Sequence, residues 1–369
     1  MKVNTISLNS VRLNTIALNH IGEIRSGGGG SKPSPIPQWI REHIVFYYDV
    51  KKQGATNETL KESAYLQDLS GKGRRMKLNN FLFAEMSGVG GYNDNFSNWK
   101  TDSNNGVVKI ESDSSIVMQS VKIEYRGALY QDGSKKATLK CNITGITEEL
   151  KGKLVFRYTD AEGSKNITLE NGYFEFNSSE YEGLSGWYGF TSKQPIDNCN
   201  ITITQIPEYP GALVTDGVDD YGLVENLSSG VKMLFMTVNP IGNFNSFKNY
   251  YSQMRNAANQ PFCVYSTPAG IAYNYSNLNG ITYIDGVLNE SIGCTKLWGL
   301  KHTITIVNDT VNPTNSGQPA FFSREEWRKG YYSKIAFYNS IAFDSIPTEA
   351  DGFTEQELID YVLTNIIGQ

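Results

Sequence analysis

The stretch Gly211-Ala212-Leu213-Val214-Thr215-Asp216-Gly217-Val218-Asp219-Asp220-Tyr221-Gly222 decides how the rest of the chain is organised. It is preceded by Pro207 and Pro210, which end a strand pattern because proline cannot donate a ladder hydrogen bond. In that pattern Ile201 and Ile203 alternate with threonines, as expected of a strand with one solvated face. New strand patterns follow the stretch, so it marks a junction between two β regions.

The junction resembles the opening of a β-sandwich of the laminin-G/concanavalin-like kind. In that superfamily it follows shortly after a segment of the type Asp-Leu-Ser-Gly-x-Gly, and here Asp68-Leu69-Ser70-Gly71-Lys72-Gly73 ends about 140 residues earlier. The resemblance implies one laminin-G-like sandwich, residues 38–90 plus 208–369, split by a second domain at 91–207. Such insertions are tolerated where the termini of the inserted domain lie close together at an exposed turn.

Length and composition agree with two β domains. The 369 residues exceed what a single core usually organises, and 39% hydrophobic with 19% charged residues is typical of a globular protein. Aromatic residues at 12% and 35 glycines favour sheets joined by tight turns. We predict a mostly-β fold of two antiparallel β-sandwiches, jelly-roll and concanavalin-like, one inserted in the other, with an extended N-terminal arm and a C-terminal helix.

The region 91–207 has the punctuation of an antiparallel domain. Asn93-Asp94-Asn95-Phe96 with Trp99 resembles the opening of jelly-roll carbohydrate-binding modules. Turn dipeptides such as Asp132-Gly133 and Asn171-Gly172 separate its strand patterns. The predicted strands are 116–125, 137–143, 154–158, 166–169, 173–176 and 200–206.

The outer domain is predicted to contain strands at 44–48, 76–83, 232–238, 262–267, 271–275, 282–284, 303–307 and 334–343. It ends in a helix. Thr354 and Glu357 form a capping box, with Phe353 and Leu358 placed as its hydrophobic staple. Gly368 is placed to close the helix.

The N-terminal 25 residues are predicted to form a docking arm. A ten-residue repeat places Ile6, Leu8, Ile16 and Leu18 on one face of extended chain. An isolated apolar strand needs a partner, which is another copy of the chain or a larger assembly, although the arm folding back onto the main sandwich is the alternative. Residues 26–37, rich in Gly and Pro, are assigned to a linker.

Several function classes are disfavoured. The net charge of -5 and the lack of a Lys/Arg stripe argue against nucleic acid, and no apolar run is long enough to cross a membrane. The first 25 residues lack the apolar core of a signal peptide. Hydrolases of the concanavalin-like superfamily alternate three acids along one strand, whereas Glu111-Ser112-Asp113 has only two. The histidines, His20, His43 and His302, match no catalytic motif, so we expect no enzymatic activity.

Sugar binding is the sharper expectation, because lectin-like sandwiches stack pyranose rings on exposed aromatic side chains. The candidates are Trp187 and Tyr188, in a glycine-flanked loop of the insert, and four residues of the outer domain, Tyr250, Tyr251, Tyr273 and Tyr275. The alternative for each is burial in a sandwich core. Trp187 is the strongest candidate because its neighbouring glycines favour a loop tip.

Structural Ca²⁺ is the one cofactor that the resemblance implies, since such sandwiches often hold it on loop carboxylates. Asp216, Asp219 and Asp220 are clustered, and Asp94 and Asp197 lie near the two ends of the insert. Turn capping by these acids is the alternative.

The arm, linker, split sandwich and inserted jelly roll together resemble virion proteins of phages and prophages of gut Bacteroidales. The segments that carry the resemblance best are 48–58, 68–73 and 216–221. It implies a structural or adhesive head fibre or capsid decoration, exposed on the particle surface, that docks on capsid or other virion proteins through residues 1–25 and forms a homo-oligomer, with a trimer assumed by analogy. Host or mucus glycans are the expected ligands. The alternatives are a tail fibre or receptor-binding protein, and a free bacterial surface glycan-binding protein.

Overall fold

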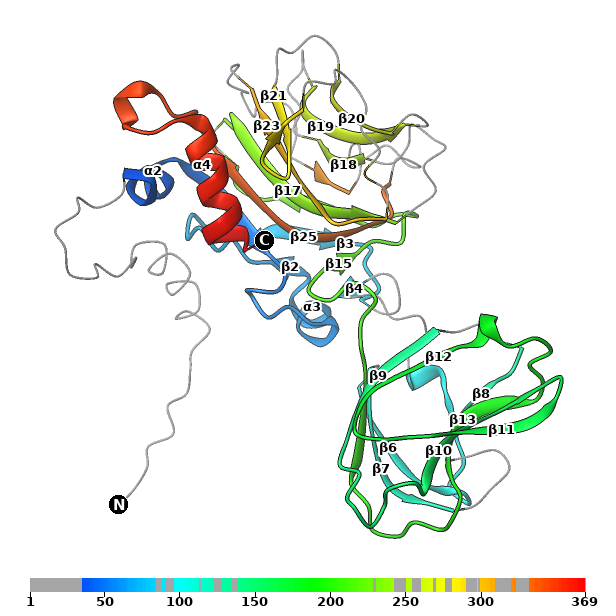
Figure 1. Cartoon of the computed structure of the whole chain (residues 1–369). Coiled ribbons are helices and arrows are strands. Elements are labelled where there is room, and N and C mark those ends of the chain that lie inside the picture. The colour runs from blue at the N-terminus through cyan, green and yellow to red at the C-terminus, as the bar shows by residue number, and fades with distance from the viewer. Residues whose placement is uncertain are drawn as a thin grey trace, which may run out of the picture. The chain divides into compact units, whose positions relative to one another are not determined.

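The chain forms two units, each an antiparallel β-sandwich, and ends in a helix, so the predicted fold class is confirmed (Figure 1). The predicted docking arm, with Ile6, Leu8, Ile16 and Leu18, lies outside the residues that this computed structural model describes. Those residues are 35–83, 88–89, 96–112, 114–122, 128–134, 138–227, 230–241, 250–253, 260–267, 270–275, 281–289, 297, 299–308, 320–322 and 332–368.

The first unit contains the described residues up to Phe83, the strand at Gly88–Val89 and those from Gly211 onward. Its eight-stranded sheet has the order β22-β21-β23-β17-β25-β15-β4, and β1 also pairs with β25. The bounds are β1 Ile44–Asp49, β4 Gly88–Val89, β15 Leu213–Val214, β17 Met233–Pro240, β21 Ile281–Ile284, β22 Val287–Leu288, β23 His302–Val307 and β25 Ile335–Phe343.

The seven-stranded sheet of the same unit has the order β2-β3-β16-β24-β18-β19-β20. Its strands are β2 Tyr65–Leu66, β3 Met76–Asn79, β16 Tyr221–Val224, β18 Tyr250–Gln253, β19 Gln260–Thr267, β20 Gly270–Tyr275 and β24 Ala320–Phe321. A short helix, α3 (Asn57–Ser63), precedes β2.

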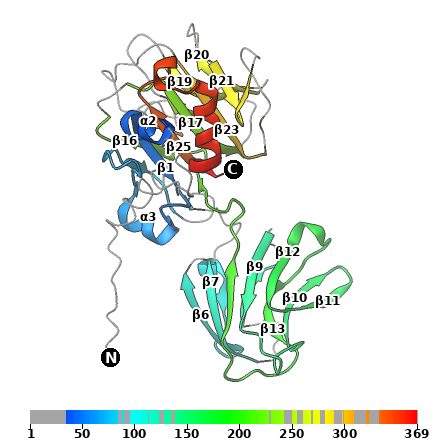
Figure 2. The ribbon, with the colours of Figure 1, turned by 60° about the vertical axis from the view of Figure 1, so that its left-hand side comes forward.

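The eight-stranded sheet is covered on both faces. One face packs on the seven-stranded sheet in a core that includes Phe46, Leu234 and Phe321. The other face, with Phe235 and Ile341, packs on helices α2 (Pro35–His43) and α4 (Glu355–Tyr361) and on the π-helical turn Val362–Ile367 (Figure 2). Because successive strand residues project to opposite faces, β17 is buried at every position.

Helix α2 corrects the predicted linker, which extended to residue 37. Pro35 and Pro37 occupy its first turn, where the missing N–H costs nothing and the fixed φ suits a helix. The helix is held by Trp39, which is 4% exposed and lies 5.4 Å from Phe343 and 5.9 Å from Phe353 between ring centroids. Residues 35–37 therefore belong to the first unit and not to a linker, because Trp39 packs their helix against it.

The C-terminal helix begins as predicted. Thr354 Oγ1 accepts from the N–H of Glu357 at 3.2 Å, and the N–H of Thr354 donates to Glu357 Oε2 at 2.7 Å. Phe353 and Leu358 share one core, and Gly368 ends the helical segment at a φ of 70°. The capping box and its staple therefore fix where the helix starts over the sheet.

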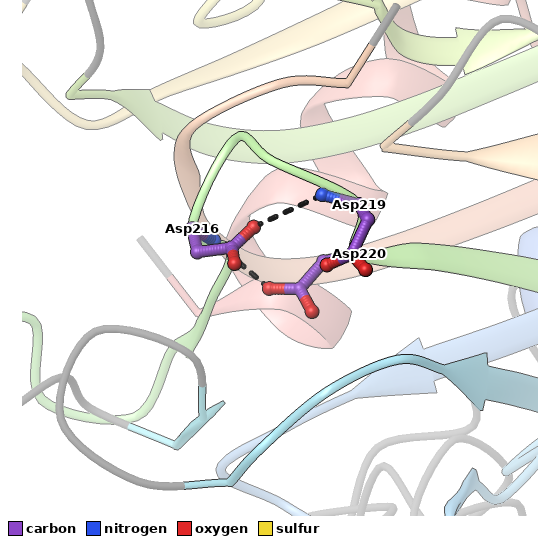
Figure 3. Close-up of side chains that lie close together, drawn as sticks. All are labelled: Asp216, Asp219 and Asp220. Carbon is purple, nitrogen blue, oxygen red and sulfur yellow. Dashed lines mark hydrogen bonds between the residues drawn. The ribbon is translucent and has the colours of Figure 1, made fainter. Parts of the chain in front are cut away.

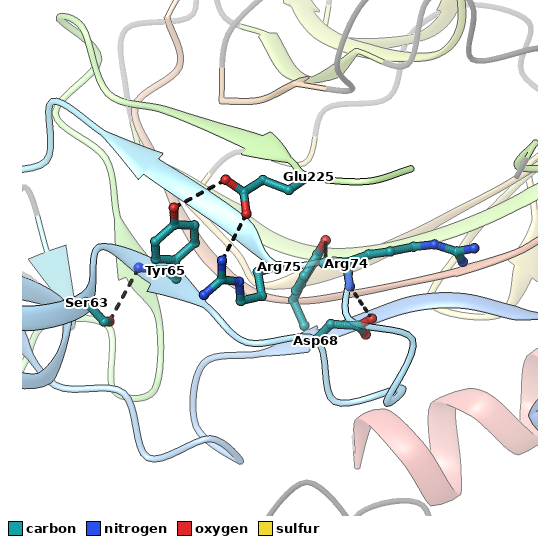
Figure 4. A network of polar contacts seen from close by, with 7 residues as sticks. Ser63, Tyr65, Asp68, Arg74, Arg75 and Glu225 are labelled. Carbon is teal, nitrogen blue, oxygen red and sulfur yellow. Dashed lines mark hydrogen bonds and ion pairs between the residues drawn. The ribbon is translucent and has the colours of Figure 1, made fainter. Parts of the chain in front are cut away.

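The Asp68–Gly73 segment is a structural loop. The buried carboxylate of Asp68 accepts backbone N–H groups from Tyr47 at 3.0 Å and Ser70 at 2.9 Å. It also accepts the N–H of Arg74 at 3.0 Å (Figure 4). The guanidinium of Arg74 returns to the carbonyl of Val45 at 2.6 Å. One carboxylate thereby ties the loop to β1 by satisfying buried donors.

Beside this loop, three side chains close a surface contact between β2 and β16. Arg75 stacks over the ring of Tyr65 with its guanidinium 4.2 Å from the centroid, and it contacts Glu225 at 3.3 Å. The hydroxyl of Tyr65 donates to the same carboxylate at 3.2 Å (Figure 4). Arg75 and Tyr65, which lie near the loop, therefore have a structural role in these contacts.

The end of β1 is locked to the C-terminal helical segment. Tyr47 Oη donates to Asp49 Oδ2 at 2.9 Å and lies 3.2 Å from the carbonyl of Ile366, which also accepts from Lys52 Nζ. Burial raises the pKa of the Asp49 carboxyl, although hydrogen bonds from Lys52 and Tyr47 oppose the shift. The segment 48–58 therefore begins with residues that hold the fold together.

The second unit contains the described residues between 90 and Pro210. Its two five-stranded sheets have the orders β11-β10-β13-β8-β5 and β12-β9-β14-β7-β6. Their strands are β5 Lys100–Thr101, β6 Gly106–Ser112, β7 Ser115–Val121, β8 Leu129–Asp132, β9 Thr138–Thr144, β10 Leu154–Asp160, β11 Gly163–Thr168, β12 Gly172–Asn177, β13 Trp187–Ser192 and β14 Ile201–Gln205.

The core of the second unit lies between these sheets and is rich in aromatic rings. Phe156 lies 4.7 Å from Phe176 and 5.1 Å from Phe190 between ring centroids. In β14, Ile201 and Ile203 are buried while the intervening threonine is half-buried, as the sequence predicts. Strand β14 therefore turns its threonines to the outer face of its sheet.

The chain leaves and re-enters the first unit through neighbouring strands. β4 pairs antiparallel with β15, with Val89 opposite Leu213 and Gly88 opposite Val214. The junction stretch of the sequence thus completes a strand pair of the host sheet.

Candidate functional site

The outer face of the sheet β11-β10-β13-β8-β5 carries a row of side chains suited to ligand binding. In β13, Tyr188 and Phe190 belong to the core, so Trp187 and Gly189 project to the opposite face. Residues directly opposite in neighbouring strands share a face. Across the five strands the row at Gly189 consists of Asn166, Arg157, Gly189, Tyr130 and Lys100.

Two aromatic rings stand together on this face. The centroids of Trp187 and Tyr130 are 5.8 Å apart with an angle of 55° between the planes, and both residues are half-buried. Gly189 lies opposite Tyr130, and a Cβ there would be 2.3 Å from the carbonyl oxygen of Leu129. Because only glycine fits at this position, main-chain atoms form the surface of the sheet beside the two rings. We call this surface the backbone floor.

Polar side chains lie on the same face of the sheet as the two rings. Arg157 Nε donates to Asn166 Oδ1 at 2.9 Å, which fixes the plane of the guanidinium. Lys193 Nζ donates to Thr168 Oγ1 at 3.1 Å on the same face of β11. We name the set Trp187, Tyr130, Gly189, Arg157, Asn166 and Lys100 the aromatic row. Flat rings beside fixed hydrogen-bonding groups are the usual elements of a sugar site.

The structure separates the six sequence-predicted sugar contacts. Trp187 lies on the outer face, although it begins a strand and is not a loop tip. Tyr188 and Tyr251 are buried, at 0% and 1% exposure, so those two predictions are wrong. Successive strand residues alternate between the two faces, and each of these rings falls on the face that packs in a hydrophobic core. Tyr250, Tyr273 and Tyr275 fall in β18 and β20, and their side chains lie outside the described residues.

The predicted acidic cluster is assembled. Asp216, Asp219 and Asp220 bring one carboxylate oxygen each within 4.8 Å of one another (Figure 3). Asp216 Oδ1 accepts from the N–H of Val218 at 2.7 Å, and the N–H of Asp216 donates to Asp220 Oδ2 at 2.9 Å. These bonds give Asp216 and Asp220 a turn-capping role, as the alternative to calcium binding predicted.

The second acidic pair stays a prediction. Asp197 is exposed in the loop before β14, whereas Asp94 lies outside the described residues.

Two of the three histidines make structural contacts with aspartates. His43 Nδ1 lies 2.9 Å from Asp344 Oδ1, and His302 Nδ1 lies 2.6 Å from Asp285 Oδ2. Asp285 also accepts the N–H of Thr303 at 2.7 Å, which ties the β21–β22 turn to β23. The ordinary structural role that the sequence favours accounts for both.

No protein-family model, curated protein or solved structure matches the chain. Across the described ranges, no helix combines the length and apolarity needed to cross a lipid bilayer.

Proposed function

We propose that the protein is a non-enzymatic adhesive protein that binds glycans on the aromatic row of its inserted sandwich. The observation that carries this proposal is the pair Trp187 and Tyr130 on the outer face of the sheet, beside a backbone floor that Gly189 alone permits. The C–H faces of a pyranose ring pack on such rings, while hydroxyl groups hydrogen-bond to nearby side chains.

A glycan array with the full chain tests this site. We expect Trp187→Ala to weaken binding of any captured glycan about tenfold or more, which corresponds to about 1.4 kcal/mol. Tyr173→Ala is the matched control, because Tyr173 is an exposed aromatic on the outer face of the other sheet of the same unit. Equal loss in both variants, or no captured glycan, would contradict the proposal.

We also propose that this adhesive protein is a virion appendage, a head fibre or capsid decoration that docks through residues 1–25. The support is the sequence resemblance together with the apolar repeat of that segment. A tail fibre and a free bacterial surface lectin are the competing assignments.

Mass measurement and particle association separate these assignments. The full chain is expected to form a defined oligomer and to bind purified capsids, whereas a chain that begins at Ser34 should stay monomeric and unbound. Binding to isolated tails would favour a tail fibre. Two monomers that ignore particles yet bind glycans would favour the free lectin.

A further inference from the structure

We propose that the second unit pairs with the same unit of a second copy of the chain along strand β6, across a two-fold axis that passes through Ile110. This inference goes beyond the glycan proposal and does not depend on it. It adds a contact between copies to the assembly that residues 1–25 are proposed to direct.

Strand β6 forms one edge of its sheet (Figure 2). Within the described part of the sheet, β6 pairs with β7 alone. An edge strand presents backbone N–H and C=O groups that a further strand can pair with. Apolar side chains are exposed here as well, since Val107 is 51% exposed and Ile110 is 38% exposed. The edge is therefore a surface that another strand can cover.

The charges on β6 indicate both the partner and the register. Lys109 Nζ lies 2.8 Å from Glu111 Oε1, and both residues are exposed. When two copies of one strand run antiparallel in a continuous sheet, the two-fold axis passes through a residue that then faces itself. An axis at Lys109 or at Glu111 places like charges opposite each other. An axis at Ile110 places Lys109 of each copy opposite Glu111 of the other, and opposite charges stabilise a cross-strand pair.

Ile110 lies at the centre of the proposed contact. It is paired with Ile116 of β7, which belongs to the core of the unit, so Ile110 lies at the rim of that core. Packing against Ile110 of a second copy removes its exposed apolar surface from water, which favours association. One strand thus supplies backbone groups, an apolar centre and two self-complementary charges.

The same strand also limits the strength of the contact. Its ladder with β7 is irregular between Val107 and Val108 and between Ile110 and Ser112, so the regular part of the edge is short. A single short strand pair is smaller than a standard interface, which buries about 1,200 Å² or more in total. We therefore expect pairing where copies are held close together, at high effective concentration, and not in dilute solution.

Disulfide trapping in the full chain tests the contact. Ile110→Cys places a thiol opposite the same thiol of the second copy, at a separation that suits a disulfide. Under mild oxidation of concentrated protein, we expect a disulfide-linked dimer to form at least about tenfold faster than in Tyr173→Cys. Tyr173 is exposed on β12, at the opposite edge of the same sheet, so this variant measures random collision. The natural chain controls for its own four cysteines.

Charge exchange tests the register, with Ile110→Cys kept in every chain. Lys109→Glu or Glu111→Lys alone places like charges opposite each other, so each should slow dimer formation about fivefold or more. Mixing these two variants restores opposite charges across the pair, so the mixed dimer should form about as fast as the parent dimer. The double variant Lys109→Glu/Glu111→Lys should recover as well. A role of the Lys109–Glu111 ion pair within one strand predicts recovery in the double variant but not on mixing.

Three results would overturn the proposal. The first is dimer formation in Ile110→Cys that is no faster than in Tyr173→Cys. The second is a mixture of the two charge variants that recovers no faster rate than either variant alone. The third is a photo-crosslinker at position 110 that links to residues 1–25 and not to a second β6, which would assign the edge to the N-terminal segment.

Discussion

The eight-stranded sheet of the first unit and the sheet containing β13 in the second differ in what covers them. The first is packed on both faces, and its strand β17 is buried at all positions. In the second, the described core cluster lies on one face; on the other face Val155 and Thr191 are buried, whereas strand β11 alternates between half-buried and exposed residues. A sheet covered twice acts as scaffold, whereas a sheet whose second face is only partly covered can offer some of its side chains to a ligand.

The largest expected effect comes from a cavity in the twice-covered sheet. Phe235 is fully buried, and its ring lies 6.0 Å from that of Phe343. We expect Phe235→Ala to lower the free energy of unfolding by about 3–5 kcal/mol. Tyr173→Ala, at 62% exposure on the outer face of β12, should change it by less than about 0.5 kcal/mol. Urea unfolding followed by circular dichroism measures both. Similar losses of unfolding free energy in the two variants would contradict the difference between the two sheets.

Overpacking at Gly189 tests whether the aromatic row depends on backbone. Gly189→Ala would place a methyl group 2.3 Å from the Leu129 carbonyl and 2.7 Å from Tyr130 Cα, so β8 and β13 must shift. We expect a loss of about 1–3 kcal/mol in unfolding free energy, with weakened glycan binding. Thr202→Ala, a half-buried outer-face residue of β14, is the control. An unchanged melting temperature would show that the floor is not tightly packed.

The helix that covers the second face of the eight-stranded sheet depends on its cap. Thr354→Ala removes the acceptor of the Glu357 N–H and should cost about 1 kcal/mol. Thr348 caps the short 3₁₀ helix Glu349–Asp351, none of whose residues is buried, so Thr348→Ala should cost less. Thermal denaturation compares the two. A larger loss of stability in Thr348→Ala than in Thr354→Ala would mean that the Thr354–Glu357 capping box does not stabilise the packing of the helix on the sheet.

Double coverage also buries a carboxylate, and the smallest predicted effect is its pH dependence. Burial raises the pKa of Asp49 above its ordinary value of 3.8. The folded state therefore holds the proton more tightly than the unfolded chain does, and the contribution of Asp49 to stability falls as pH rises from 3.8 through the raised value. Asp49→Asn lacks this component. The stability of the natural chain relative to the variant should fall over that range, and a rise would reverse the assigned direction.

Elements defined by local pattern could be predicted from the sequence. The alternation at Ile201 and Ile203 places β14, and the Thr354–Glu357 capping box places the C-terminal helix. Helix α2 could not be predicted, because Trp39 and Ile40 favour a helix only when the sheet is there to receive them. Pro35 and Pro37 are compatible with the first turn of a helix, but packing on the sheet decides that the helix forms.

Only part of the candidate site was within reach of sequence reasoning. The glycines beside Trp187 single it out in the sequence, but the same glycines are typical of a loop. They therefore predict neither strand β13 nor the burial of Tyr188. Alternation of Tyr188 and Phe190 would have been the signal that separates the two faces. Arg157 and Tyr130 lie opposite Gly189 on the two neighbouring strands. This strand register is set by pairing between distant parts of the sequence, so local patterns do not predict it.

The pairing of β4 with β15 makes the inserted sandwich an exchangeable cassette. Val89 and Leu213 face each other across one strand pair, so the host needs only a tight turn between them to close its own sheet. The inserted unit could therefore be exchanged between these two positions while the host sandwich stays unchanged. Under the proposed function, glycan specificity would change by replacement of this unit, with no change to the host sheet.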